Sequence, residues 1–314
     1  MTSSAIAVSG LRKAFGDKVV LDGIDLDVRA GTVFSLLGPN GAGKTTTVNV
    51  LTTLMKADGG TVHVGGHDVA TDAKAVRAVI GVTGQFAAVD ELLTGRENLQ
   101  LMADLNSAVS AADGRRVVVE LLERFDLMGS ADKAASTYSG GMRRKLDLAM
   151  TLVGNPQIIF LDEPTTGLDP RSRRTMWSII RDLVAGGVTI FLTTQYLEEA
   201  DQLADQIAVL DQGRLVAHGT PGDLKRQIPG THVRLRFTTV EDLDAAAVLF
   251  PGCTRDEDGL TLRVPSDGGT RSLRAVLDRL DEHALGAEEF SVHTPDLDDV
   301  FLALTGHTTK AGAK

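Results

Sequence analysis

The sequence predicts an α/β protein built on a mostly parallel sheet, followed by a small α+β domain. Residues 32–37 form a short apolar run that leads into a glycine-rich loop and then into a helix without a breaker. Residues 157–161 form a second apolar run that ends in two acids, as expected for a strand buried on both faces of a parallel sheet. From residue 232 onward apolar and polar side chains alternate, which indicates a half-exposed strand in a second unit.

The composition is that of an ordinary globular protein. The chain has 314 residues, enough for one large and one smaller domain, with 43% hydrophobic and 24% charged residues. A net charge of −10 disfavours nucleic acid as a partner, and the single Cys253 excludes an internal disulfide or a cysteine zinc cluster. No apolar run approaches the roughly 18 residues of a membrane span, and the first residues lack a secretory pattern. We therefore expect a cytoplasmic protein.

The glycine-rich loop is expected to bind a phosphate chain. It comprises Gly38, Pro39, Asn40, Gly41, Ala42, Gly43, Lys44 and Thr45, and Thr46 continues into the helix. Glycines let backbone N–H groups turn toward phosphate oxygens, and the helix adds its positive end. The Lys44 ammonium can reach the outer phosphates, and the Thr45 hydroxyl can bind Mg²⁺. The pattern therefore predicts a site for a nucleoside triphosphate with Mg²⁺.

The two acids after the second apolar run, Asp162 and Glu163, are candidates for catalysis. Ligands of α/β sheets bind at the carboxyl ends of the strands, where these acids are expected. Asp162 can hold Mg²⁺ through water, and Glu163 can orient and deprotonate an attacking water. By itself the pattern could also be a strand end that meets solvent, but the phosphate loop in the same chain favours the catalytic interpretation.

A third motif, Ser139-Gly140-Gly141, precedes a predicted helix at residues 143–150. Its hydroxyl and closely spaced N–H groups form another anion site. The phosphate loop, this motif and the acidic strand end, in that order, resemble those of an ABC (ATP-binding cassette) ATPase. The resemblance covers about residues 5–225.

This resemblance implies a domain organisation. Residues 1–225 would form the ABC ATP-binding domain, a P-loop NTPase fold with a mostly parallel core sheet, an antiparallel N-terminal subdomain and a helical subdomain at about residues 86–150. Residues 226–308 would form the accessory α+β domain, and residues 309–314 a disordered tail.

The resemblance also implies roles for single residues. Phe15 would stack on adenine, although it could instead be a core residue of an N-terminal strand. Gln85 would contact Mg²⁺ and mark a mobile joint, and Asp169 would contact the nucleotide of the opposite subunit of a dimer. The metal site would then be formed by Thr45, Gln85 and Asp162, and the catalytic groups would be Lys44, Glu163 and Gln195.

Gln195 departs from the wider superfamily, which has a histidine at this position. Similar drug-export ATPases can also carry glutamine, so the change does not indicate an inactive protein. An amide can donate a hydrogen bond, but it cannot carry a proton near neutral pH. This favours Glu163 over a histidine relay as the general base.

The segment between Gln85 and Ser139 has the spacing of amphipathic helices at residues 92–105 and 115–125. The resemblance makes this segment the helical lobe that contacts a membrane partner. The alternative is a plain helical insertion that stabilises the main sheet.

The C-terminal unit combines strands and helices. We expect strands at 232–238, 260–264 and 290–292, and helices at 241–250, 271–282 and 296–304, with Gly306 as a stop and residues 310–314 frayed.

Residues 297–306 resemble the C-terminal motif of the daunorubicin-resistance (DrrA-type) drug-export ATPases, and residues 138–144 and 194–201 resemble other segments of that family. This implies an ATPase that energises efflux of a hydrophobic or amphipathic small molecule, of the antibiotic type, through a separate membrane permease. It would act peripherally, at the cytoplasmic face of the membrane. Because each motif occurs once, the working unit would be a dimer of this chain, which we favour, or a pair with a related chain. Its two cassettes would close around two ATP molecules, with Ser139 covering the partner's nucleotide.

Other functions remain open at this stage. A close second is the export of a lipid or glycoconjugate by a similar pair of proteins. A soluble ABC ATPase acting on DNA or ribosomes would carry zinc cysteines, long coiled-coil insertions or two cassettes, and this chain shows none of these patterns. A regulatory ATP-binding module without turnover is suggested by Gln195 but opposed by Glu163. The transported compound cannot be read from the chain, because selectivity should lie in the permease.

Overall fold

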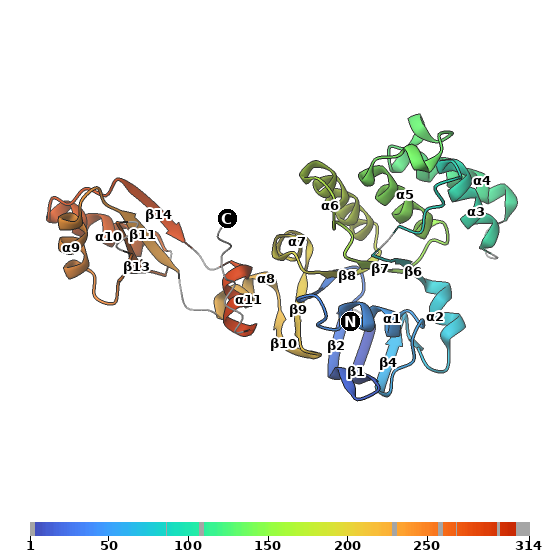
Figure 1. Cartoon of the computed structure of the whole chain (residues 1–314), viewed down its shortest axis with the longest axis horizontal. Helices are drawn as coiled ribbons and strands as arrows, with labels where there is room; N and C mark the ends of the chain where they lie inside the picture. Colours follow the sequence, from blue (N-terminus) through green and yellow to red (C-terminus); the bar gives the residue numbers. More distant parts are fainter. Residues whose placement is uncertain are drawn as a thin grey trace. The chain divides into compact units, whose positions relative to one another are not determined.

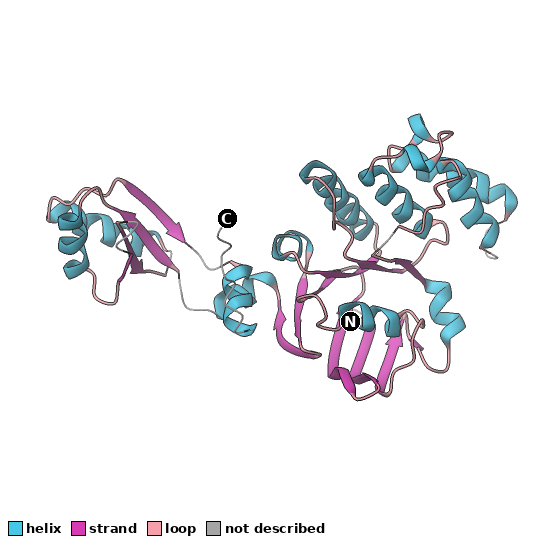
Figure 2. Ribbon diagram, viewed as in Figure 1, coloured by secondary structure: helices cyan, strands magenta, loops and turns pink. Residues whose placement is uncertain are grey.

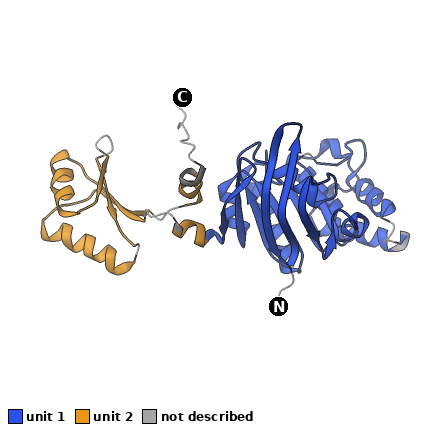
Figure 3. Cartoon of the chain, turned by 90° about the horizontal axis from the view of Figure 1, so that it is seen from below, with its two compact units in different colours: residues 1–221 blue, residues 222–314 orange. Residues whose placement is uncertain are grey.

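The computed structural model describes residues 4–85, 87–106, 110–227, 231–256, 260–267, 269–293 and 296–305. The chain divides into two compact units, residues 1–221 and 222–314, which are coloured separately in Figure 3. The helices and strands are labelled in Figure 1 and coloured by type in Figure 2.

The first unit is organised around a six-stranded sheet with the order β10-β9-β3-β8-β7-β6. Its strands are β3 (Val33–Leu37), β6 (Ile80–Thr83), β7 (Ile158–Asp162), β8 (Thr189–Thr194), β9 (Gln206–Asp211) and β10 (Arg214–Gly219). All neighbours pair in parallel except β10, which runs antiparallel to β9. The predicted mostly parallel core sheet is therefore confirmed.

A second sheet of the first unit is antiparallel and has the order β2-β1-β4-β5. Its strands are β1 (Ser4–Phe15), β2 (Lys18–Arg29), β4 (Gly59–Val64) and β5 (His67–Asp68). Helix α1 (Lys44–Leu51) lies between the two sheets in Figure 1, and α2 (Ala73–Val79) leads into β6. This sheet is the antiparallel N-terminal subdomain expected from the sequence.

The central strands are apolar on both faces because each face covers a separate core. In β7, Ile158 and Phe160 join the core shared with α1 and the antiparallel sheet. Ile159 and Leu161 join a second core with the helices of the other face. The period-two alternation of a strand thus sends neighbouring apolar residues to opposite cores.

The second core is formed with the helical subdomain and with α6 (Pro170–Ala185). The elements of the helical subdomain are α3 (Gly95–Leu105), α4 (Ala111–Arg124), the 3₁₀ turns Met128–Ser130 and Ala135–Thr137, and α5 (Gly140–Leu152). Helix α7 (Leu197–Leu203) connects β8 to β9.

The second unit has a four-stranded antiparallel sheet with the order β12-β13-β11-β14. Its elements are α8 (Pro221–Gln227, of which Pro221 belongs to the first unit), β11 (His232–Arg236), α9 (Val240–Leu249), β12 (Thr254–Asp256), β13 (Thr261–Pro265), α10 (Thr270–Glu282), β14 (Glu289–His293) and α11 (Leu297–Thr305). Buried Val233, Leu235 and Leu262 form its core with Leu243 and Leu280 of the two longer helices.

Three predicted helix starts were wrong. The helix expected from residue 92 begins at Gly95, because Thr94 forms a capping box in which its hydroxyl accepts the Glu97 N–H at 3.1 Å and its N–H reaches the Glu97 carboxylate at 2.8 Å. The helices expected from residues 115 and 143 begin earlier, at Ala111 and Gly140, because the Ser110 and Ser139 hydroxyls cap them.

Among the residues that the structure describes, no helix is long and apolar enough to cross a membrane. The expectations for Phe86, Gly306 and the tail at 309–314 lie outside the described residues.

Candidate nucleotide-binding and hydrolysis site

The predicted phosphate loop connects β3 to α1, at the carboxyl end of the central sheet. Two of its glycines are required by geometry. A Cβ at Gly38 would collide with the carbonyl oxygen of Leu210 on β9. Gly43 has φ 114°, and a Cβ there would lie 2.7 Å from Leu21 Cδ2. The loop is therefore held close to two neighbouring strands in a conformation that favours glycine.

Lys44 is a buried lysine with hydrogen bonds to its own loop. Its ammonium donates to the carbonyl oxygens of Gly38 at 2.9 Å and Pro39 at 3.1 Å. It also lies 3.4 Å from Glu163 Oε1, and both side chains are less than a tenth exposed. The ammonium is thus fixed between the phosphate loop and the acidic end of β7.

Thr45 and Asp162 form a compact set of oxygen atoms. The Thr45 hydroxyl donates to Asp162 Oδ2 at 2.9 Å, and the Thr193 hydroxyl donates to Asp162 Oδ1. Mg²⁺ prefers hydroxyl, carboxylate and amide oxygens, so this set fits that ion. In the part of the chain that the structure describes, no group of three or more His, Cys, Asp and Glu is arranged for a metal.

Glu163 occupies an unusual backbone position directly after β7. Its φ of 49° lies in the left-handed region, a sparsely populated conformation for a residue other than glycine. Its N–H reaches the backbone carbonyl of Thr193 at 3.1 Å, which fixes the turn. Its carboxylate accepts from the Thr166 hydroxyl at 3.2 Å, and the Gln85 amide lies at 3.5 Å, the long end of the hydrogen-bond range. The carboxylate is therefore aimed at the region shared by Lys44 and Gln85.

Gln195 follows β8 and is half-buried. Its neighbour Tyr196 donates its N–H to the Thr194 hydroxyl at 2.9 Å, and the guanidinium of Arg173 on α6 lies 5.2 Å from the Tyr196 ring centroid. A cation over a ring face is attractive. These contacts hold the loop that carries Gln195 between β8 and α6.

The Ser139 motif and Asp169 lie together but apart from the phosphate loop. Ser139 caps α5 by accepting the Met142 N–H, and Asp169 caps α6 by accepting the N–H groups of Arg171 and Ser172. A Cβ at Gly141 would lie 2.6 Å from Ser172 Oγ, so the two helix starts are adjacent. Among the described residues, no hydrogen bond or ion pair joins Ser139, Gly140 or Asp169 to the phosphate loop.

Phe15 ends β1 and is 49% exposed, with the Lys13 ammonium 5.6 Å from its ring centroid. The alternative of a core residue is therefore wrong. An exposed aromatic face is suited to stacking on a planar base.

The sequence interpretation missed residues that support the site. Thr193 holds both Asp162 and the backbone N–H of Glu163, and Arg144 and Asp147 of α5 hold the loops on either side. Thr193 left a signal, because a threonine pair ends an otherwise apolar strand. The buried charges on α5 left none, since Arg and Asp near a helix start are ordinary surface residues.

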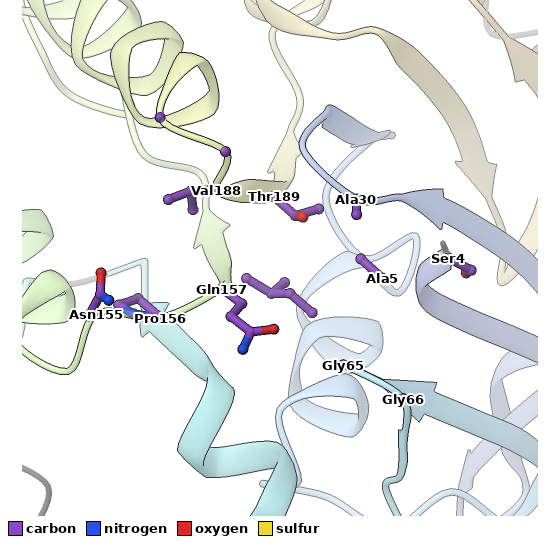
Figure 4. A pocket seen from close by; sticks show the side chains of 13 residues that line it. Ser4, Ala5, Ala30, Gly65, Gly66, Asn155, Pro156, Gln157, Val188 and Thr189 are labelled. Atoms are coloured by element: carbon purple, nitrogen blue, oxygen red, sulfur yellow. The ribbon is translucent and has the colours of Figure 1, made fainter. Parts of the chain in front are cut away.

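A separate pocket of about 480 Å³ lies at the opposite edge of the central sheet, where β7 and β8 begin (Figure 4). Its lining consists of Ser4, Ala5, Ala30, Gly65, Gly66, Asn155, Pro156, Gln157, Ile158, Gly186, Gly187, Val188 and Thr189. No predicted site residue lines it, and no side chain in this lining is charged. It is therefore distinct from the candidate site.

Comparisons with known proteins agree with this geometry. The ABC transporter family pattern matches residues 21–166, which include the phosphate loop, the Ser139 motif and the acidic strand end. The chain is 50% identical over 308 residues to "Daunorubicin resistance ATP-binding protein DrrA3" of Streptomyces coeruleorubidus, covering 98% of this chain and 97% of that one. It is 49% identical to the daunorubicin/doxorubicin resistance ATP-binding protein DrrA of Streptomyces peucetius, covering 96% and 93%. The chain belongs to the daunorubicin-resistance family of ABC transporter ATP-binding proteins.

More distant relatives place this ATPase within a wider group. The Nod factor export ATP-binding protein I of Ralstonia nicotianae is 38% identical over 303 residues, covering 96% of this chain and 94% of that one. A solved ATP-binding subunit of an ABC transporter superposes with a TM-score of 0.64 at 28% identity, covering 71% of this chain and 93% of that one. A nucleotide-free ATP-binding cassette from an ABC transporter gives a TM-score of 0.63 at 27% identity, covering 69% and 92%. As a member of this family, the chain binds and hydrolyses ATP.

Proposed function

We propose that this ATPase drives export of a hydrophobic or amphipathic small molecule, of the antibiotic type, through a separate membrane permease. It acts as a homodimer, peripherally, at the cytoplasmic face of the membrane. The observation that carries the substrate class is the 49–50% identity, over nearly the whole chain, to proteins named for daunorubicin resistance. The second candidate is export of a lipid or glycoconjugate, which the relatives named for Nod factor export favour at lower identity, 38–39%.

The phosphate chain of ATP lies along the loop before α1 in this proposal. Lys44 has three N–H donors, which face Gly38, Pro39 and Glu163, so the outer phosphates would replace at least one of these contacts. Phe15 stacks on the adenine ring. Mg²⁺ supplies charge neutralisation at the phosphates when bound, and Thr45, Asp162 and Gln85 would hold it.

Glu163 is the proposed general base. Its carboxylate orients a water molecule in line with the terminal phosphate and accepts a proton from it. The hydrogen bonds from Thr166 and Gln85 restrict where that carboxylate can point. Gln195 donates an amide hydrogen bond to the terminal phosphate oxygens, but it cannot accept and pass on the proton. The water oxygen bonds to the terminal phosphorus as the bond to the ADP oxygen breaks, and Glu163 passes its proton to the phosphate product or to water before the next turnover.

A homodimer would complete the site. Ser139 and the N–H groups of Gly140 and Gly141 begin a helix of 13 residues and form an anion site of their own. Because these groups have no link to the phosphate loop of the same chain among the described residues, we assign them to the nucleotide of the partner copy. Closure of two copies around two ATP molecules then couples assembly to hydrolysis and to movement of the permease.

The experiment compares the wild-type ATPase with Glu163→Gln. We expect ATP binding within about threefold of wild type and steady hydrolysis reduced at least about 100-fold, the usual effect of a lost base. With ATP, light scattering should report a Glu163→Gln dimer, and adding Ser139→Arg should keep it monomeric. Cells that contain the ATPase and its native membrane companion should lose daunorubicin efflux with either variant.

Each outcome separates one part of the proposal. Near-normal hydrolysis by Glu163→Gln would reject the assigned base, and a dimer that survives Ser139→Arg would reject the shared site. Daunorubicin efflux that is independent of the ATPase, with glycoconjugate export that depends on it, would replace the first substrate class by the second.

A further inference from the structure

Arg144 and Asp147 on α5 form a buried ion pair that belongs to none of the predicted motifs. Both side chains are less than a tenth exposed, and Arg144 Nη1 lies 3.2 Å from Asp147 Oδ2. A buried charged pair contributes little to stability by itself, since desolvation offsets its attraction. Its hydrogen-bond partners therefore indicate what the pair does.

The guanidinium of Arg144 binds three backbone carbonyls. Nη1 donates to the Gly84 carbonyl at 2.8 Å, Nε donates to the Pro164 carbonyl at 2.9 Å, and Nη2 donates to the Asp162 carbonyl at 3.2 Å. Asp147 adds a fourth backbone contact, because its Oδ1 accepts the Ala88 N–H at 2.9 Å. The planar guanidinium fixes the directions of these bonds.

These contacts bracket two proposed active-site residues. Gly84 and Ala88 lie on either side of Gln85, and Asp162 and Pro164 lie on either side of Glu163. The side chains of Gln85 and Glu163 themselves meet at 3.5 Å. A single ion pair on α5 thus fixes the backbone on both sides of each residue.

We propose that the Arg144–Asp147 pair is a positioning device that transmits movement of α5 to Gln85 and Glu163. Helix α5 is capped by Ser139 and belongs to the helical subdomain, whereas Glu163 follows a strand of the central sheet. Rotation of the helical subdomain against the sheet must therefore either move the Gln85 loop (Gly84, Gln85, Ala87 and Ala88) and the Glu163 turn together or break the bonds of the pair. The pair acts through these backbone segments and does not touch ATP.

The test uses a variant that removes the pair without leaving one charge buried alone. In Arg144→Met/Asp147→Leu both partners become apolar, a change that buried ion pairs often tolerate. We expect its melting temperature to stay within a few degrees of wild type, its kcat for ATP to fall about 10–100-fold, and its KM to change less than threefold. Arg144→Lys keeps the positive charge but lacks the planar guanidinium with its several fixed N–H donors. Its kcat should therefore lie between those of the double variant and the wild type.

A double-mutant cycle on kcat with Gln85→Ala distinguishes positioning of Gln85 from a general structural role of the pair. If the pair acts through Gln85, removing it in the Gln85→Ala background should cost less than about threefold, because interacting sites are not additive. Arg143→Met is the matched control, since its side chain on the same helix pairs with Glu91 instead, and it should leave kcat unchanged.

The proposal is overturned if Arg144→Met/Asp147→Leu retains the wild-type kcat. It is also overturned if the fold-reduction in kcat caused by this double variant is the same in the wild-type and the Gln85→Ala backgrounds. If the double variant fails to fold, Arg144→Lys replaces it in the cycle with Gln85→Ala, and the same two results would overturn the proposal. The inference rests on the proposed role of Glu163, which the single Glu163→Gln variant tests separately.

Discussion

Glu199 on α7 illustrates how burial changes the chemistry of one side chain. It is fully buried, and the Trp177 indole N–H donates to its Oε1 at 3.2 Å. Burial raises the pKa of the Glu199 carboxyl above its usual value, while the neighbouring Thr194 and Thr165 hydroxyls, the Trp177 hydrogen bond and the charge of Arg173 act in the opposite direction. The charged form is therefore disfavoured in the folded protein.

The raised pKa of Glu199 predicts that the free energy of unfolding depends on pH. As pH rises above the usual value of 4.5, the unfolded chain loses this proton before the folded one does, so stability falls until the folded pKa is passed. Glu199→Gln keeps an acceptor for Trp177 but cannot ionise. Its melting temperature relative to wild type should therefore increase between pH 4 and pH 8, as measured by calorimetry.

The neighbouring Glu198→Gln is the control for this measurement, because the Glu198 side chain is 68% exposed. Its difference from wild type should not vary with pH in the same way. A Glu199→Gln difference that stayed constant or shrank with rising pH would show that Glu199 ionises freely in the folded protein.

At the start of α6, the Asp169 carboxylate has two roles, an observed helix cap and a proposed contact with the partner's nucleotide. Asp169 caps this helix through its Oδ1, and its Oδ2 accepts the Ser172 hydroxyl at 2.6 Å. These hydrogen bonds, that of Ser172 first, lower the pKa of the carboxyl. The proposed contact with the partner's nucleotide must therefore be made by a group whose orientation the helix cap already determines.

Two substitutions at Asp169 separate these assignments. Asparagine is as good a helix cap as aspartate, so Asp169→Asn should leave the melting temperature nearly unchanged. Asp169→Ala removes the cap and should lower it by about 2–4 °C. The rate of ATP hydrolysis should fall in both variants if the carboxylate also contacts the nucleotide of the partner copy. Normal hydrolysis by Asp169→Asn would limit the role of Asp169 to capping α6.

At the scale of the whole molecule, the two units have separate cores. The first unit buries two clusters on the two faces of its central sheet, and the second buries a cluster between its own sheet and helices. All proposed nucleotide-site residues belong to the first unit. We therefore expect nucleotide binding not to require the second unit.

We predict that a chain truncated after Gln227 folds and binds ATP within about threefold of the full-length affinity, because a unit with its own core can fold alone. Isothermal titration would measure the affinity, and circular dichroism would report folding. Residues 231–305 expressed alone serve as the counterpart and should show a cooperative thermal transition. Failure of the truncated chain to fold would show that the second unit supplies part of the stability of the first.

Much of the site was predictable because its groups are consecutive in the chain. The phosphate loop, the strand ending in Asp162 and Glu163, and the Ser139 motif each combine a local conformation with a local chemical pattern. The sequence likewise predicted β11, β13 and β14 of the second unit to within a few residues, but it did not predict β12. The errors at the starts of α3, α4 and α5 arose where capping chemistry, and not hydrophobic spacing, sets the start of a helix.

The chain sequence alone was sufficient for the fold class and the family, and it proposes the reacting groups, since these depend on short segments whose conformation is local. The three-dimensional fold decided which distant residues meet. Arg144 reaches Gly84 across 60 positions of the chain and Pro164 across 20. Such contacts depend on how α5 packs against the central sheet. The burial of charged residues such as Arg144 and Asp147 produces no periodic pattern in the sequence.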